Sequence, residues 1–117
     1  MNVIGTRPDQ WWRDRDGAMH RLVDQLERWA VTENEDVTVV FERPPSPPVR
    51  STVIEVAHAP KPKANAADDE IVRRLEIDPE PHTIRVVSSD RALAERAWGL
   101  GATVEGADSF RRRIDEL

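Results

Sequence analysis

The sequence predicts an α/β fold in which helices cover both sides of a mostly parallel sheet. Three observations support this class. Short β-branched runs at 37–41 and 84–87 have the continuous apolar character of strands that are buried on both faces. Amphipathic helical patterns span 13–30, 67–78 and 91–100. Strands that alternate with helices favour parallel pairing, because a crossover helix returns the chain to the same end of the sheet.

The size and charge of the chain narrow the possible functions. With 117 residues, the chain is expected to form a single domain over 1–117. The net charge of -5 argues against nucleic-acid binding through bulk positive charge, so a phosphate substrate would be met locally by a metal ion and a few arginines. The sequence has no cysteine, no leader pattern and no apolar run that could span a bilayer, which predicts a cytoplasmic protein without membrane contact.

The first part of the chain is expected to contain one long helix and two strands. Residues 1–4 resemble the end of a strand whose beginning is missing, because Gly5 turns the chain at once. In the helix over 13–30, Asp14 or Asp16 is the expected cap. Strand 37–41 precedes a proline-rich loop, and 51–59 is expected to be an edge strand. The apolar face predicted for the helix consists of Ala18, Met19, Leu22, Val23, Leu26 and Ala30.

The second part is expected to continue the alternation. A helix over 67–78 places Asp68 at the head of an apolar stripe, with Asp69 on the solvated side. The strand over 84–87 leads into a helix that Gly101 ends. A short strand follows over 102–104. The closing helix is expected to bury Phe110, Ile114 and Leu117.

Three carboxylates fall at the ends of these elements. Asp90 follows the strand over 84–87, Glu42 follows the strand over 37–41, and Asp68 opens a helix. Ligands of open parallel sheets collect beyond the carboxyl ends of the strands, so the three side chains are candidates for one site. Oxygen ligands of this kind suit Mg²⁺ or a similar hard cation, which needs only one or two direct carboxylates.

Simpler structural roles remain open for the same residues. Asp90 has the position of a helix cap, and Asp68 has that of a partner for the positive end of a helix dipole. Ser88 and Ser89 are favoured as turn or capping residues, because no histidine or lysine lies at a spacing that would make either a nucleophile. The three histidines are scattered over different elements, which makes a zinc site improbable.

Seven segments together resemble one family over essentially the whole chain. They are MNVIG, WWRDRDGA, VTVVFE, ADDEIVRRL, VVSSDRALAERA, GATV and SFRRRID. In this order they are similar to the YacP-like NYN domains, a branch of the PIN-like ribonucleases. The resemblance implies a three-layer α/β/α PIN-like sandwich, a Mg²⁺ or Mn²⁺ site, and cleavage of single-stranded RNA.

The resemblance also implies site residues, and it shows two departures from the family. The family's Ala-Asp and Ser-Asp motifs fall on Asp68 and Asp90, which are implied as catalytic metal ligands. Where the family has Phe-Asp-Gly, this chain has Phe41, Glu42 and Arg43, so Glu42 is implied as a third ligand of altered geometry. The family's first strand and first metal-binding aspartate are absent before Met1. The chain is therefore expected to be a shortened member or to start at an internal methionine.

The leading hypothesis is a metal-dependent endoribonuclease that uses a metal-activated water. Asn2 and Ser89 are expected to position ligands, water or phosphate, and Arg13 and Arg15 to bind the substrate. The alternative is a catalytically impaired RNA-binding or protein-interaction module that keeps the fold, and a nucleotide phosphohydrolase is a weaker third reading. The resemblance leaves ribosome association and a homodimer open.

Overall fold

The structure, a computed structural model, describes residues 15–44, 46–60 and 65–116. Its elements follow the predicted order of helices and strands, with one short 3-10 helix in addition. The expected partial first strand, Asp14 and Leu117 lie outside the described residues. The elements are α1 (Arg15–Glu33), β1 (Thr38–Phe41), β2 (Glu55–His58), α2 (Ala66–Ile77), η3 (Pro81–Thr83), β3 (Arg85–Val87), α3 (Arg91–Gly99), β4 (Thr103–Glu105) and α4 (Ala107–Asp115).

The strands form two parallel pairs within the part of the chain that the structure describes. β1 pairs with β2, with Phe41 opposite His58, and β3 pairs with β4, with Val87 opposite Glu105. Each pair is joined through a longer crossover, as parallel strands require. The prediction of parallel pairing is therefore confirmed. Within each pair, the carboxyl ends of both strands lie on the same side.

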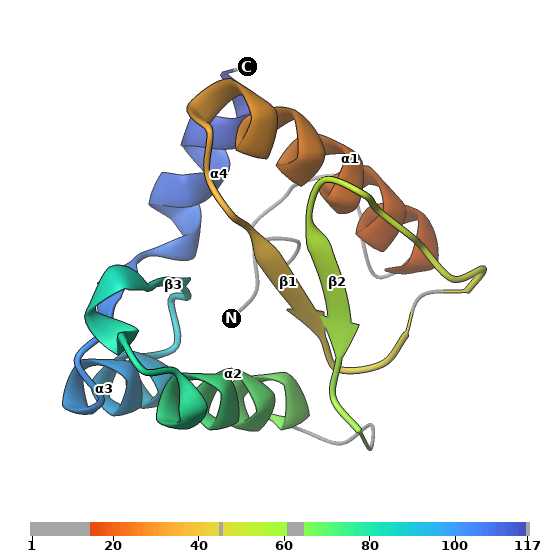
Figure 1. The fold of residues 1–117 in the computed structure, drawn as a ribbon. Helices are drawn as coiled ribbons and strands as arrows, with labels where there is room; N and C mark the ends of the chain where they lie inside the picture. Colours follow the sequence, from red (N-terminus) through yellow and green to blue (C-terminus); the bar gives the residue numbers. More distant parts are fainter. Residues whose placement is uncertain (1–14, 45, 61–64, 117) are drawn as a thin grey trace.

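The helices lie in two layers with the strands between them (Figure 1). Two successive residues of β3 show this most directly. Val86 belongs to a core with α2 and α3, whereas Val87 packs against the core of α1 and α4. Successive side chains of a strand point to opposite faces, so a strand with apolar contacts on both faces is covered on both sides. The α/β layered architecture predicted from the sequence is confirmed.

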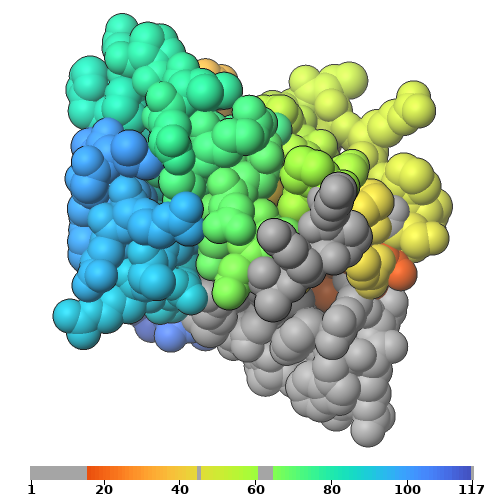
Figure 2. All heavy atoms as spheres, turned by 90° about the horizontal axis from the view of Figure 1, so that it is seen from below, coloured from red at the N-terminus to blue at the C-terminus, as the bar shows by residue number. Residues whose placement is uncertain are grey.

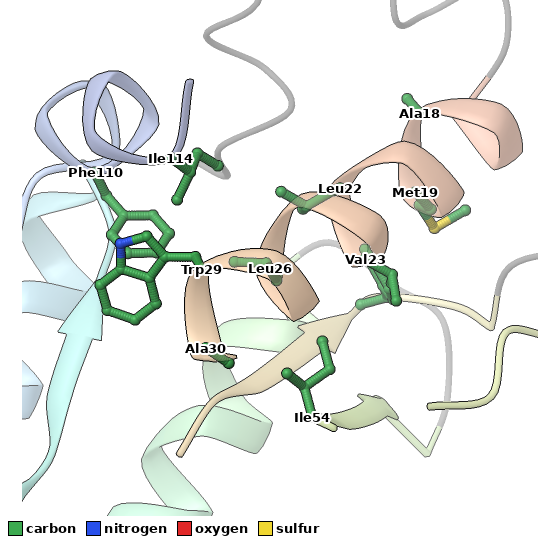
Figure 3. Packing of buried hydrophobic residues seen from close by; sticks show 11 residues of the cluster. Ala18, Met19, Leu22, Val23, Leu26, Trp29, Ala30, Ile54, Phe110 and Ile114 are labelled. Atoms are coloured by element: carbon green, nitrogen blue, oxygen red, sulfur yellow. The ribbon is translucent and has the colours of Figure 1, made fainter. Parts of the chain in front are cut away.

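The larger core joins α1, α4 and the β1–β2 pair (Figure 3). All six apolar residues predicted for α1 are buried, and Trp29 joins them with 2% of its surface exposed. The ring of Trp29 meets the ring of Phe110 at 5.1 Å in an edge-to-face arrangement. The guanidinium groups of Arg85 and Arg113 lie 5.8 and 5.4 Å from the centre of the Trp29 ring, so one tryptophan connects α1, β3 and α4.

Of the two residues expected to cap α1, Asp14 lies outside the described residues. Asp16 lies inside the first turn of α1 and accepts hydrogen bonds from Arg43 and from the backbone of Ser46, both at 3.0 Å, so it holds the loop after β1. The strand predicted over 51–59 is shorter, because the Ser51 hydroxyl accepts hydrogen bonds from two backbone N–H groups and forms a turn. None of the helices within the described ranges is long and apolar enough to cross a membrane.

Candidate functional site

A hollow with a volume of about 310 Å³ lies where α2 and α3 begin. The two helices lie side by side on this face of the molecule, α2 in green to teal and α3 in blue (Figure 2). The lining of the hollow combines three carboxylates with one amide and one guanidinium group. The described lining residues are Asn65, Asp68, Asp69, Asp90, Ala92, Leu93 and Arg96.

Asp90 is fixed at the end of β3 by two hydrogen bonds. Its backbone N–H donates to the hydroxyl of the buried Ser88 at 3.0 Å, and its Oδ1 accepts from the backbone N–H of Leu93 at 2.9 Å. Asp90 is thus the N-cap of α3, as its position after a strand allows. Capping occupies Oδ1, so the second carboxylate oxygen remains for a ligand in the hollow.

Asp68 lies in the first turn of α2, as predicted. Asn65 is the N-cap, in a left-handed conformation with φ of 63° and without a capping side-chain hydrogen bond. Burial raises the pKa of the Asp68 carboxyl, and the charge of Asp90 is the next cause. Glu42 and Asp69 raise the pKa further, which shows that these carboxylates lie within electrostatic reach of one another.

Glu42 directly follows β1 and is exposed. Its charge acts on Asp68, but Glu42 is not among the described residues that line the hollow. Within the described ranges, no three side chains of the histidine, cysteine, aspartate or glutamate type come close enough to hold a metal ion. The structure therefore brings Asp68 and Asp90 together and leaves Glu42 at the edge of the site.

The expected substrate-binding residues have different outcomes. The hydroxyl of Ser89 accepts a hydrogen bond from the backbone N–H of Ala107 at 2.9 Å, which satisfies a free N–H at the start of α4. Arg15 begins α1, but its side chain lies outside the described part of the structure, as do Asn2 and Arg13. Their assignment to substrate binding stays a prediction.

Sequence reasoning missed two residues of the hollow, Asn65 and Arg96. Asparagine tolerates the left-handed conformation better than most residues, so an asparagine just before a helix was a usable signal for Asn65. No sequence signal identified Arg96, which reaches the hollow through the packing of α3 against α2. Its Nη1 lies 3.1 Å from Oδ1 of Asp69.

Ion pairs around the buried carboxylate of Glu70 connect α2 to its surroundings. Glu70 is 6% exposed and accepts hydrogen bonds from Arg73 and Arg74, and the bond from Arg73 is the main cause that lowers its pKa to about 2. Arg74 also contacts both carboxylate oxygens of Glu55 on β2 at 3.1 Å. This network ties the helix that carries Asp68 to the neighbouring strand pair.

The fold and the site define an α/β domain with paired acidic residues at the carboxyl ends of parallel strands. The family model of the YacP-like NYN domain matches residues 2–117, so the chain belongs to this family, as the sequence predicted. The family implies a PIN-like nuclease fold, generally with divalent metal ions, and it suggests interaction with RNA.

The structure is similar to the crystal structure of Rae1 (YacP) from Bacillus subtilis. The TM-score is 0.79 at 21% sequence identity, and the match covers 98% of this chain and 70% of that chain. A likeness at this identity establishes the fold. In a comparison with curated proteins, no sequence matches the chain.

The residues of the hollow fit a hard divalent cation. Asp68 and Asp90 offer carboxylate oxygens, and Asn65 adds a neutral amide at the same site. Burial and the charge of Asp90 raise the pKa of Asp68, and a bound cation would act against both. Mg²⁺ and Mn²⁺ prefer oxygen donors, and Mg²⁺ needs only one or two protein carboxylates beside water and substrate phosphate.

Proposed function

We propose that this chain is a metal-dependent endonuclease for single-stranded RNA. The observation that carries the proposal is the meeting of Asp68 and Asp90 in one hollow, where a cation would favour the ionised form of Asp68 against burial and the charge of Asp90. Membership of a family that suggests RNA interaction supports RNA as the substrate. Association with ribosomes and the formation of a homodimer belong to this proposal as expectations.

In the proposed reaction, Asp68 and Asp90 would hold Mg²⁺ or Mn²⁺, with Glu42 as a third candidate ligand. The bound metal supplies Lewis-acid stabilisation of phosphate charge and lowers the pKa of a water nucleophile. Asp90 is oriented by its capping bond to Leu93, so its free oxygen has a defined direction. Asp68, half-buried in the first turn of α2, is oriented by a helix that the Glu70 network ties to β2.

The test uses purified chain, a labelled single-stranded RNA, and Mn²⁺ or Mg²⁺. The wild type should cut the RNA internally, and Asp68→Asn and Asp90→Asn should each lower the cleavage rate by about a hundredfold or more, because each removes one anionic ligand. Asp24→Asn is the matched control, since it removes one carboxylate charge from the exposed side of α1. It should cleave like the wild type.

Titration calorimetry separates the enzyme from the impaired binding module. An intact site takes up Mn²⁺, and Asp90→Asn reduces this uptake, whereas the Asp24→Asn control leaves it unchanged. RNA binding without Mn²⁺ uptake and without cleavage would favour the module. Absence of cleavage, RNA binding and metal uptake in the wild type would reject the proposal.

A further inference from the structure

Arg96 differs from the other described residues that line the hollow, because it is the one cation among them. It projects from the second turn of α3 toward the start of α2, where it meets Asp69. The ion pair thus spans the two helices that carry the metal-binding candidates. Asp68 and Asp90 lie in the same lining, so the guanidinium group and the carboxylates border one open hollow.

The contact with Asp69 leaves most of the Arg96 guanidinium group for another ligand. It uses Nη1 and one carboxylate oxygen at 3.1 Å, and the side chains of Arg96 and Asp69 are 49% and 54% exposed. A guanidinium group carries five N–H donors in a rigid fork. Exposed ion pairs of this kind add little to stability, so stability alone is a weak reason for this arrangement.

The chemistry of the hollow requires a cation for an anionic substrate. A phosphodiester that approaches Asp68, Asp69 and Asp90 meets carboxylates of its own sign. Arginine binds phosphate oxygens through two parallel hydrogen bonds, which fix the orientation of the group. A metal ion at Asp68 and Asp90 and the guanidinium group of Arg96 in the same lining would together offset the charge of the incoming strand.

We infer that Arg96 binds a backbone phosphate of the RNA strand at this hollow, and that Asp69 competes with the phosphate for the guanidinium group. The inference rests on the proposed function, because it names the contact through which the same site holds its substrate. Before RNA binds, the guanidinium group is paired with Asp69. Binding then exchanges part of an ion pair within the protein for one with the phosphate.

The experiment compares Arg96→Gln, Asp69→Asn, the double variant and Arg91→Gln. Arg91 is the matched control, because it lies on the same helix, pairs with Glu95 at 3.3 Å and is not among the described lining residues. Two quantities are measured with a short fluorescein-labelled single-stranded RNA. They are the dissociation constant, from fluorescence anisotropy in EDTA, and kcat/KM for cleavage in Mn²⁺.

Arg96→Gln should weaken RNA binding and lower kcat/KM by about tenfold or more, because a charge-assisted hydrogen bond to phosphate is lost. Asp69→Asn should act in the opposite direction and tighten binding by about two- to fivefold, because the competing carboxylate is gone. In the Arg96→Gln background, Asp69→Asn should have no such effect. Arg91→Gln should stay within about twofold of the wild type.

A purely structural ion pair predicts a different pattern, in which Arg96→Gln and Asp69→Asn weaken binding alike. That result, or an Arg96→Gln variant that behaves like Arg91→Gln, overturns the inference and leaves the proposed function standing. Thermal unfolding of each variant shows whether the fold is kept. A wild type that neither binds nor cleaves RNA overturns the proposed function, and this inference with it.

Discussion

Asp68 on α2 and Asp90 at the start of α3 line the same hollow, and the charge of Asp90 is, after burial, the main cause of the raised pKa of Asp68. Burial and the neighbouring negative charge both disfavour the ionised form of Asp68, and this costs stability. Such a cost is typical of functional sites. The raised pKa of Asp68 can also be tested through the pH dependence of stability, without the substrate.

Asp68→Asn should stabilise the metal-free protein while it abolishes cleavage. The pKa of Asp68 in the folded chain lies above its ordinary value of 3.8, so the folded state holds the proton more tightly than the unfolded state. The free energy of unfolding therefore falls as the pH rises from 3.8 to the raised pKa. At pH 7, in EDTA, the amide should raise Tm by roughly 2–5 °C.

The gain from Asp68→Asn should shrink below pH 3.8, where the carboxyl group is protonated in both states. Asp24→Asn, on the exposed side of α1, is the control and should shift Tm little at either pH. Thermal unfolding followed by circular dichroism measures both. A lower Tm for Asp68→Asn at pH 7 would contradict the electrostatic account of the site.

Ser89→Ala should reveal whether Ser89 has a structural or a ligand-binding role. The Ser89 hydroxyl accepts the hydrogen bond from Ala107 N–H at the start of α4, so its removal should cost about 1 kcal/mol in the free energy of unfolding. Urea unfolding measures this loss. The exposed Ser109, which bonds to Glu105 on the surface, provides the control in Ser109→Ala.

A role of Ser89 at the substrate predicts an additional effect. At a temperature where Ser89→Ala and Ser109→Ala are both fully folded, Ser89→Ala should then cleave RNA more slowly than Ser109→Ala. Cleavage equal to that of Ser109→Ala would limit Ser89 to the support of α4.

Stability at acid pH should depend on Glu70. The hydrogen bonds from Arg73 and Arg74 lower its pKa to about 2 from an ordinary value of 4.5. The ionised Glu70 therefore stabilises the fold fully above pH 4.5, and this stabilisation is lost as the pH falls toward 2. Glu70→Gln should flatten the decline of stability in this interval, whereas Glu76→Gln, at an exposed position of the same helix, should keep it. Urea unfolding at a series of pH values measures both slopes.

Ile114→Ala should destabilise the seam between α1 and α4. Ile114 is 2% exposed and belongs to the core that contains Trp29 and Phe110, so truncation removes apolar contacts and leaves a cavity. The expected loss is about 2–5 kcal/mol in the free energy of unfolding. Val31→Ala, at a position that is 70% exposed, should change it by less than about 0.5 kcal/mol. Urea unfolding compares the two, and equal losses would show that this seam is not a close-packed core.

The sequence alone predicted the elements that depend on local pattern. The apolar period of α1, the β-branched runs of β1 and β3, and Gly101 after α3 each appear at or near the expected place, and Gly101 has the positive φ of 96° that favours glycine. The position of Asp90 after β3 was also predictable, because a strand that gives way to serines and an aspartate both ends the strand and caps a helix.

Only the tertiary structure decided which side chains meet. Arg96 joins the hollow because α3 packs against α2, and Glu42 is not among the described residues that line it. Glu70 is buried and pairs with two more exposed arginines, although its helix position gave no sign of this. Local pattern follows from backbone geometry and apolar period, which neighbouring residues determine. Distances between elements depend on how whole helices pack, and that depends on contacts between residues far apart in the chain.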